Sequence, residues 1–358
     1  MNRGGLETML MNYYRQIDRS NIQFDFMVHR NEKGHYDDEI LCLGGRIYKM
    51  PPIRPGKYRT YFKQLDVFFS EHPEYKVVHA HNNENSSFVL RAAERAGVDC
   101  RIAHSHLSDL TLDVKMPFRL YARYIMKDYP TEYFACSEKA GQWLFGREKS
   151  NQLKVLHNAV NVNEFKYSEE IRNKIRQELG IHGNQLVIGH VGRFNKQKNH
   201  DFLIDIFNSL VKKNPNSVLL MIGEGNLKKQ IADKVAKYHL LSKVKFLGVR
   251  SDIANLMQGM DLFLFPSLFE GLPVVLVEAQ AAGLKCIISD SITNETDLTG
   301  RLEFISLNKD SEYWANKILQ STYEHADTSE QLIKNGYDST TTAKWLSGYY
   351  SSYYNVAK

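Results

Sequence analysis

The sequence predicts an α/β protein built from two doubly wound domains. Short apolar runs alternate with amphipathic helical stretches along the whole chain, which is typical of parallel sheets covered by helices on both faces. The 358 residues exceed the size that one hydrophobic core normally serves. A polar, asparagine-rich segment without clear periodicity, residues 157–170, interrupts this alternation near the middle of the chain. We therefore place the domain boundary there.

Six strand-like runs precede that segment and six follow it. Each run is short and apolar, as expected for strands that are buried on both faces. The expected strands are residues 23–29, 45–50, 76–81, 100–106, 132–137 and 153–158 in the first half, and 185–193, 217–225, 243–248, 262–267, 285–290 and 301–307 in the second.

The intervening helices show apolar residues at three- and four-residue spacing, most clearly in residues 200–213 and 227–241. Residues 342–354 carry a stripe of Trp and Tyr side chains that has to pack on another surface. The predicted domains are residues 1–158 and 159–340, followed by a helix, residues 341–358, that packs back on the first domain.

The chain opens with a Gly4–Gly5 turn and a helix-like run over residues 6–17. Such a turn normally follows a β-strand, and only three residues precede it here. The predicted fold therefore lacks the first strand of its N-terminal domain, and an empty strand position would leave backbone groups unpaired.

Composition indicates an ordinary soluble globular protein, with 43% hydrophobic and 24% charged residues and a formal net charge of +5. This mild positive charge fits an anionic ligand or membrane surface and gives no support for nucleic acid as a partner. The sequence contains neither a run of about 20 apolar residues nor the apolar core of a signal peptide. The four cysteines have no metal or redox spacing, so we expect buried thiols and a cytoplasmic location.

Residues 265–290 contain the strongest candidate site. A buried strand ends at a turn, and Pro273 stands where the first turn of a helix is expected. The free N–H groups at such a helix start bind anions, and Gly271 allows its backbone to approach a ligand closely. Glu270 precedes this helix and Glu278 lies within it, in an apolar setting where a carboxylate is expected to have a partner.

Arg193 and Lys198 follow the strand of residues 185–193 and should reach the same sheet edge as that turn. A guanidinium and an ammonium group beside a helix start suit a diphosphate, whereas the alternative is a solvated loop. The chain contains no Asp-x-Asp pair to hold a divalent ion. We therefore expect a diphosphate site without a metal and no cofactor.

The segments FEGLPVVLVEAQAAG and HVGRFNKQK resemble the retaining glycosyltransferases of family four, which have the GT-B fold of two Rossmann-like domains facing across a cleft. VVHAH, RIAHSH, ACSEKAGQWL, HNAVNVNEF and KVKFLG follow in the order that this family shows. The start of the chain is further similar to bacterial members that build exopolysaccharide or capsule. One departure is Asn199, where the family usually has glycine after the lysine.

The resemblance implies a nucleotide-sugar donor, usually UDP-linked, and gives the candidate residues roles. Arg193 and Lys198 would hold the diphosphate, Glu278 would accept from the ribose hydroxyls, and Glu270 would lie near the donor sugar. His104 or His106 would contact that sugar, and strand alternation leaves the choice between them open. Backbone contacts to the donor would come from Gly4, Gly5, Gly192, Gly248, Val249, Gly271, Leu272 and Pro273.

The first half also has basic residues interleaved with aromatic ones over residues 45–63 and 115–127. This pattern suits an anionic membrane surface or a polyprenyl-pyrophosphate-linked glycan acceptor, and its alternative is a solvated cationic face. We expect peripheral attachment to the inner membrane face. The candidate acceptor or membrane residues are Arg54, Lys57, Arg59, Lys115, Arg119, Arg123 and Lys127.

Two other functions remain open from the sequence. A nucleotide-sugar epimerase of the same fold would use a similar diphosphate site without an acceptor, although the spacing of Glu270 and Glu278 favours transfer. A catalytically inactive partner subunit of a glycosyltransferase would fit the missing first strand, although the charged residues of the candidate site are all retained.

Overall fold

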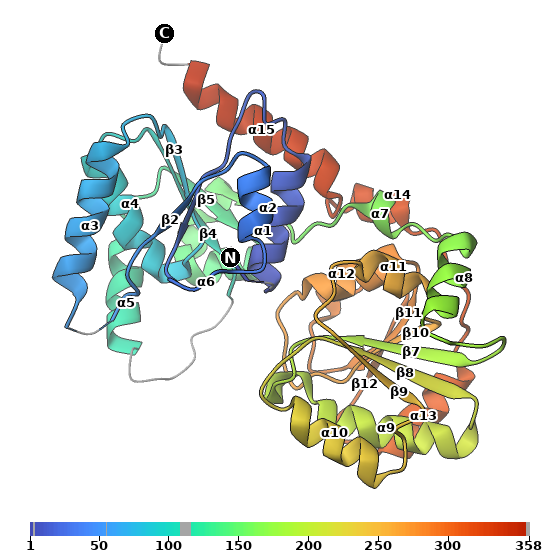
Figure 1. Ribbon diagram of the computed structural model, residues 1–358. Coiled ribbons are helices and arrows are strands. Elements are labelled where there is room, and N and C mark those ends of the chain that lie inside the picture. Colours follow the sequence, from blue (N-terminus) through green and yellow to red (C-terminus); the bar gives the residue numbers. More distant parts are fainter. Residues whose placement is uncertain (3, 55, 108–115, 356–358) are drawn as a thin grey trace. The chain divides into compact units, whose positions relative to one another are not determined.

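The structure is a computed structural model that describes residues 1–2, 4–54, 56–107 and 116–355 (Figure 1). The chain forms two compact units. The first comprises Met1–Ala159 together with Ser339–Lys358, and the second comprises Val160–Asp338.

The strands of the first unit form two parallel sheets in the described part of the chain. A two-stranded sheet pairs β1 with β2, and a four-stranded sheet has the order β3-β4-β5-β6. A cavity of about 450 Å³ is lined by residues of both β1 and β3, which belong to different sheets. The strands are β1 (Phe26–Val28), β2 (Ile47–Lys49), β3 (Val77–Ala80), β4 (Cys100–Ser105), β5 (Glu132–Ala135) and β6 (Leu153–Val155).

Helices cover these sheets and bury two main apolar clusters. One cluster joins α1 to the C-terminal helix α15 through residues such as Met9, Tyr13 and Leu346, and the other lies among α3, α4 and α5. The helices of this unit are α1 (Gly5–Gln16), α2 (Asp37–Cys42), α3 (Tyr58–Glu71), α4 (Ser86–Arg95), α5 (Met116–Ile125), α6 (Glu138–Phe145) and α15 (Ser339–Asn355), with 3-10 turns η1 (Asn83–Asn85) and η2 (Arg147–Gln152).

The second unit has a six-stranded parallel sheet with the order β12-β11-β10-β7-β8-β9. This order reverses direction between β7 and β10, and ligands of open parallel sheets bind at such a point, beyond the carboxyl ends of the strands. The strands are β7 (Leu186–Val191), β8 (Ser217–Ile222), β9 (Val244–Gly248), β10 (Leu262–Phe265), β11 (Lys285–Ser289) and β12 (Leu302–Ile305).

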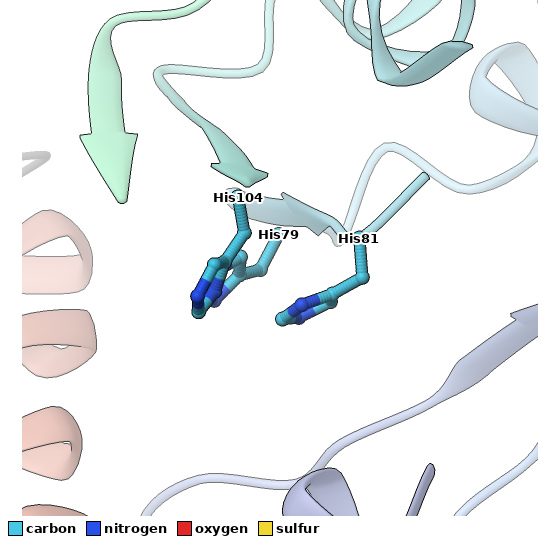
Figure 2. A group of neighbouring side chains, drawn as sticks. All are labelled: His79, His81 and His104. Carbon is cyan, nitrogen blue, oxygen red and sulfur yellow. The ribbon is translucent and has the colours of Figure 1, made fainter. Parts of the chain in front are cut away.

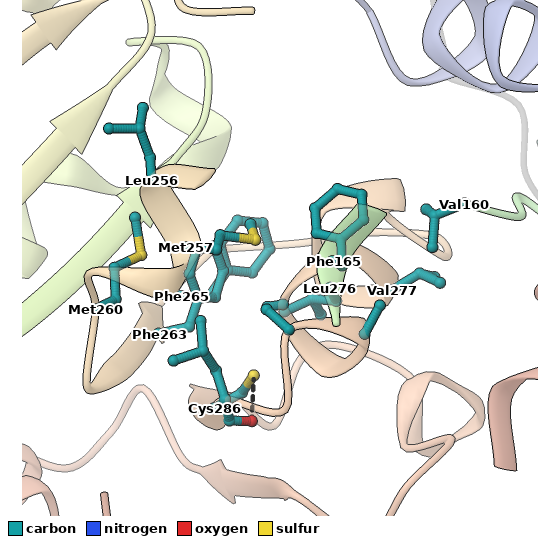
Figure 3. Packing of buried hydrophobic residues seen from close by; sticks show 14 of the residues in the cluster. Val160, Phe165, Leu256, Met257, Met260, Phe263, Phe265, Leu276, Val277 and Cys286 are labelled. Atoms are coloured by element: carbon teal, nitrogen blue, oxygen red, sulfur yellow. Dashed lines mark hydrogen bonds between the residues drawn. The ribbon is translucent and has the colours of Figure 1, made fainter. Parts of the chain in front are cut away.

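Helices pack on both faces of this sheet, as Figure 1 shows. On one face, Phe263 and Phe265 of β10 pack with Met257 and Leu276 of the covering helices (Figure 3). The other face buries Phe207 and Trp314. The elements are α7 (Val162–Phe165), α8 (Glu169–Glu178), α9 (His200–Lys213), α10 (Lys228–Lys237), α11 (Ile253–Gln258), α12 (Val274–Ala281), α13 (Ser311–Gln320) and α14 (Ser329–Lys334), with 3-10 turns η3 (Lys196–Lys198) and η4 (Asn294–Thr296).

Each of the twelve expected strand ranges contains one strand of the structure, and the helix expected over residues 200–213 has those bounds. Pro273 differs from its predicted place by one residue. It is the N-cap of α12, in extended conformation, rather than the first helical residue. Its ring fixes φ near the observed −74°, which suits the cap as well as the first turn.

Candidate functional site

The loops that follow β7, β8 and β9 form one continuous surface in the second unit. The Gly192 N–H donates to the Ile222 carbonyl over 2.9 Å, and the Gly223 N–H donates to the Gly248 carbonyl over 2.8 Å. Gly223 has a φ of 136°, and a Cβ there would lie 2.1 Å from the Gly192 carbonyl oxygen. A side chain at Gly223 is therefore excluded, and the predicted residues Gly192 and Gly248 lie on connected backbone.

A second set of hydrogen bonds joins the loop after β7 to the loop after β10. The backbone carbonyl of Gln197 accepts from the Leu268 N–H over 2.8 Å, and the Gln197 side-chain amide donates to the Phe269 carbonyl over 3.0 Å. The Asn199 side-chain amide donates to the Pro266 carbonyl over 3.1 Å. Asn199 has a φ of 52°, in the left-handed region that asparagine tolerates among non-glycine residues. This conformation explains why asparagine replaces the family's glycine at this position.

These loops bring Lys198 and Glu270 together. The Lys198 Nζ lies 2.7 Å from Glu270 Oε1, and their side chains are only 15% and 7% exposed. The Gln197 amide donates to the other Glu270 oxygen over 3.2 Å. Lys198 Nζ also lies 4.5 Å from the centroid of the Phe265 ring. The sequence predicted that both residues belong to the site and did not predict that they pair.

Arg193 differs from Lys198 in its surroundings. It follows β7 and is exposed, and no carboxylate of the described residues forms an ion pair with its guanidinium. Removing an exposed guanidinium from water is less costly when it meets an anion with matching geometry. Arg193 is thus free to bind a phosphate, whereas Lys198 already has a carboxylate partner.

The turn before α12 supplies backbone donors. Pro273 caps this helix, and no side chain in the described structure caps its first turn. A Cβ on Gly271 would meet open space, so its backbone is accessible, and Leu272 and Pro273 are partly exposed. The dipole and unsatisfied N–H groups of a helix start attract anions.

Glu278 lies within α12, and desolvation by burial raises the pKa of its carboxyl to about 7. Among the described residues, no side chain or backbone group forms a hydrogen bond with this carboxyl. The partner that the sequence predicts for this carboxyl is therefore not supplied by the described residues. A carboxyl held unpaired at this energetic cost is available to a ligand hydroxyl.

Two further residues of this unit, Gly248 and Val249, were predicted to contact the sugar donor. Gly248 is the last residue of β9 and Val249 follows it. Gly248 has a φ of 65°, which favours glycine, and the Val249 side chain is 40% exposed. Their backbone is fixed against the β8 loop by the Gly223 hydrogen bond.

In the first unit, Gly4 is the N-cap of α1 and Gly5 is its first residue. Gly4 carries no side-chain cap, and a Cβ on Gly5 would meet open space. The start of α1 thus presents accessible backbone, with Glu7 in the first turn as its one acidic residue.

His104 and His106 belong to a cluster of four histidines at the ends of β3 and β4. Parallel pairing places Ala80 beside Ala103, so the flanking histidines of both strands project from the same face. His79 Nε2 lies 3.0 Å from His104 Nδ1, and His81 Nδ1 lies 2.9 Å from His106 Nε2. Figure 2 shows His79, His81 and His104. His104 is fully buried inside this cluster, whereas His106 is partly exposed at its end.

The basic residues of the first unit separate into two groups. Arg119 pairs with the buried Glu84 and is only 14% exposed, so it is not part of an exposed cationic face. Arg123 lies over the Trp143 ring at 5.1 Å. Lys115 lies outside the described residues. The exposed members are Arg54, Lys57, Arg59 and Lys127.

The candidate residues predicted from the sequence did not include Gln197, His79 or His81. The signal for the histidines was present, because His-x-His occurs at two successive strand ends, 25 residues apart. Gln197 gave no such signal, since its contacts depend on how two distant loops meet.

Similarity to known proteins shows the family of this chain. Residues 171–339 match the family described as Glycosyl transferases group 1. The glycosyltransferase EpsF of Bacillus subtilis is 38% identical over 349 residues, which cover 94% of this chain and 91% of EpsF. An Escherichia coli enzyme named UDP-Gal:alpha-D-GlcNAc-diphosphoundecaprenol alpha-1,3-galactosyltransferase is 27% identical over 227 residues, covering 61% of this chain and 58% of that enzyme.

The structure is similar to that of HepE from Anabaena, solved with UDP and glucose. The TM-score is 0.76 at 21% identity, and the match covers 98% of this chain and 96% of HepE. This likeness confirms the predicted GT-B fold. Within the described residues, no helix is both long and apolar enough to cross a membrane. With EpsF matched along nearly its full length, the chain belongs to the group 1 glycosyltransferases, and its relatives include glycosyltransferases named for amylovoran biosynthesis in Erwinia amylovora and capsular polysaccharide biosynthesis in Staphylococcus aureus.

Proposed function

We propose that this glycosyltransferase moves a sugar from a UDP-sugar to a lipid-linked glycan acceptor, with retention of anomeric configuration and without a metal at the diphosphate. The observation that carries this proposal is the arrangement of Arg193, Lys198 and the start of α12 at one sheet edge. HepE was solved with UDP, and the Escherichia coli relative is named for a UDP-sugar donor and a diphosphoundecaprenol-linked acceptor.

In this proposal the donor diphosphate binds between Arg193 and Lys198. Arg193 supplies an unpaired guanidinium, and Lys198 keeps one N–H on Glu270 while its other two donors turn to phosphate. Backbone N–H groups of the turn at Gly271 and Leu272, and of the first turn of α12 that Pro273 caps, stabilise the negative charge of the same diphosphate. The cations and helix start take the place of a divalent ion.

The nucleoside binds along the connected loops. Glu278 accepts hydrogen bonds from the ribose hydroxyls, which supply the partner that its carboxyl lacks. The backbone at Gly248 and Val249 contacts the base, and Gly192 allows the diphosphate to approach β7.

Transfer proceeds by attack on the face from which the nucleotide leaves. The departing phosphate oxygen takes the proton of the acceptor hydroxyl, and Arg193 and Lys198 stabilise the charge that develops on the phosphate. Glu270 orients Lys198 and lies near the donor sugar. His106, at the exposed end of the histidine cluster, is our choice for the sugar contact, because His104 is enclosed by its neighbours.

The acceptor side is proposed from charge and exposure. Arg54, Lys57 and Arg59 are exposed around the start of α3. On and after α5, Tyr121 and Tyr124 are 52% and 72% exposed beside Lys127. Exposed aromatic and basic side chains together suit the headgroup region of an anionic membrane. We propose peripheral attachment to the inner membrane face, where a polyprenyl-pyrophosphate-linked acceptor would be reached.

A screen of UDP-sugars with and without lipid-linked acceptor tests this function in buffer containing EDTA. Transfer should require the acceptor and release UDP. In Arg193→Ala, turnover should fall roughly 10²–10³-fold, the effect of removing one charge-stabilising donor. The matched control Lys196→Ala, an exposed cation three residues away, should keep normal turnover. Interconversion of the donor sugar without acceptor would instead indicate an epimerase, and UDP binding without turnover would indicate an inactive subunit.

A further inference from the structure

The histidine cluster of the first unit has the donor set of a transition-metal site. One nitrogen from each of His79, His81 and His104 can be chosen so that all three lie within 4.8 Å of one another (Figure 2). Nitrogen ligands about 2.0–2.1 Å from a tetrahedral Zn²⁺ lie roughly 3.4 Å apart, so nitrogens up to 4.8 Å apart have to approach one another by as much as about 1.4 Å, which rotation of the rings can supply. We propose that His79, His81 and His104 bind a first-row divalent cation of the Zn²⁺ class.

The backbone fixes these ligands before any ion arrives. His79 and His81 alternate along the end of β3, and pairing of Ala80 with Ala103 brings His104 of β4 beside them. His79 and His104 belong to the neighbouring strands β3 and β4, and His81 is the first residue after β3. Rigid elements hold metal ligands more accurately than loops do.

Two of the three ligands also have a partner on the opposite ring nitrogen. The Tyr350 hydroxyl of α15 lies 2.6 Å from His79 Nδ1, and His106 Nε2 lies 2.9 Å from His81 Nδ1. Because both partners contact Nδ1, the Nε2 atoms of His79 and His81 remain on the opposite side of each ring and can face the ion. Metal-bound histidines usually have such a partner, because it fixes the tautomer and the orientation of the ring.

The first and third ligands face one another. His79 Nε2 and His104 Nδ1 lie 3.0 Å apart and hold one proton between them. A bound cation would replace this proton and accept an electron pair from each ring.

The surroundings leave space for a further ligand on the ion. His79 and His81 line the cavity of about 450 Å³ that reaches from β3 to β1. A tetrahedral ion with three protein ligands keeps one position for water or an anion. All the proposed ligands belong to the first unit, and we assign the ion no role in sugar transfer.

Calorimetric titration of Zn²⁺ into the full chain, after EDTA treatment and removal of the chelator, tests the proposal. The wild type should bind one equivalent, and Co²⁺ should give the visible absorption of a tetrahedral complex. His81→Ala removes a ligand at a partly exposed position and should weaken Zn²⁺ binding at least 100-fold. Tyr350→Phe keeps the ring and removes its hydroxyl, which should weaken binding roughly 10–100-fold.

His182→Ala is the matched control, because His182 is exposed in the second unit. It should bind Zn²⁺ as the wild type does. Absence of a stoichiometric site in the wild type would overturn the proposal, and so would unchanged affinity in His81→Ala. Since Zn²⁺ binding is measured without nucleotide, failure here leaves the proposed UDP-sugar chemistry standing, and loss of UDP binding leaves the metal site standing.

Discussion

Lys198 Nζ lies 2.7 Å from Glu270 Oε1, although the two residues are 72 positions apart in the sequence. The loops after β7 and β10 bring them together at the point where the order of the sheet reverses. The pair therefore places a cation and an anion side by side, both largely buried, at this edge of the sheet.

The first prediction concerns the strength of this pair. Glu270→Gln should lower the free energy of unfolding by roughly 3–5 kcal/mol, because it leaves a largely buried ammonium without its counter-charge. UDP binding should survive in Glu270→Gln and be lost in Lys198→Met. Urea denaturation and UDP titration measure the two effects.

Glu312→Gln serves as the control for that experiment. It breaks the Lys213–Glu312 pair, whose side chains are 33% and 66% exposed, and should cost less than about 1 kcal/mol. Equal losses in Glu270→Gln and Glu312→Gln would show that the Lys198 pair is not specially stabilised.

The second prediction follows from Glu278. Burial raises its pKa from the usual 4.5 to about 7 in the folded protein, so the folded state binds more protons than the unfolded state between these values. The free energy of unfolding should therefore fall as pH rises from about 4.5 to about 7, and stay low above that range. The fall attributable to Glu278 is roughly 3 kcal/mol.

Urea denaturation across this range, with Glu278→Gln for comparison, measures that contribution. In Glu278→Gln the free energy of unfolding should not show this decrease with pH, and the variant should be more stable than the wild type at pH 8. Glu330→Gln changes an exposed carboxyl and should have the pH profile of the wild type. Identical pH profiles for the wild type and Glu278→Gln would contradict the assignment.

The third prediction concerns Asn199. Asn199→Ala should destabilise the protein more than Asn199→Gly, by roughly 1–2 kcal/mol, because alanine is strained at a φ of 52° and glycine is not. Both variants lose the hydrogen bond to the Pro266 carbonyl, so the difference between their free energies of unfolding reports the backbone strain of alanine at this φ. Thermal or urea unfolding measures it, and equal stability of the two variants would argue against the left-handed conformation.

The fourth prediction tests membrane attachment. The wild type should float with vesicles containing anionic lipid at low salt, and the double variant Lys57→Glu, Arg59→Glu should remain in the soluble fraction. Each basic residue near such a surface contributes about 1 kcal/mol, so reversing two should weaken binding at least about tenfold. Lys212→Glu with Lys237→Glu makes the same charge change in the second unit and should float normally. A wild type that stays soluble would refute the attachment.

The sequence predicted the fold well where local pattern and burial coincide. Buried parallel strands appear as continuous apolar runs, so all twelve strand positions were recognisable, and α9 was predicted from its amphipathic period. Pro273 was misplaced by one residue, because proline is compatible with both the cap and the first turn of a helix. The division of the first unit's strands between two sheets was not predicted, since pairing depends on contacts between strands far apart in the chain.

The candidate site was predictable in its residues and not in their contacts. Arg193, Lys198 and Glu270 were found because the topology of parallel sheets gathers strand-end residues at one edge. Whether Lys198 pairs with Glu270 and Arg193 stays unpaired depends on how the loops pack through Gln197. The register of β3 and β4 likewise decides that His79, His81 and His104 form one cluster.

Calorimetric titration of UDP in buffer containing EDTA tests the central claim most directly. The wild type should bind one equivalent without a divalent ion. Arg193→Ala should bind roughly tenfold to hundredfold more weakly, the effect of losing a hydrogen bond between charged groups, and Lys196→Ala should bind normally. UDP binding that appears only after Mg²⁺ is added, or that is unchanged in Arg193→Ala, would contradict the metal-free diphosphate site.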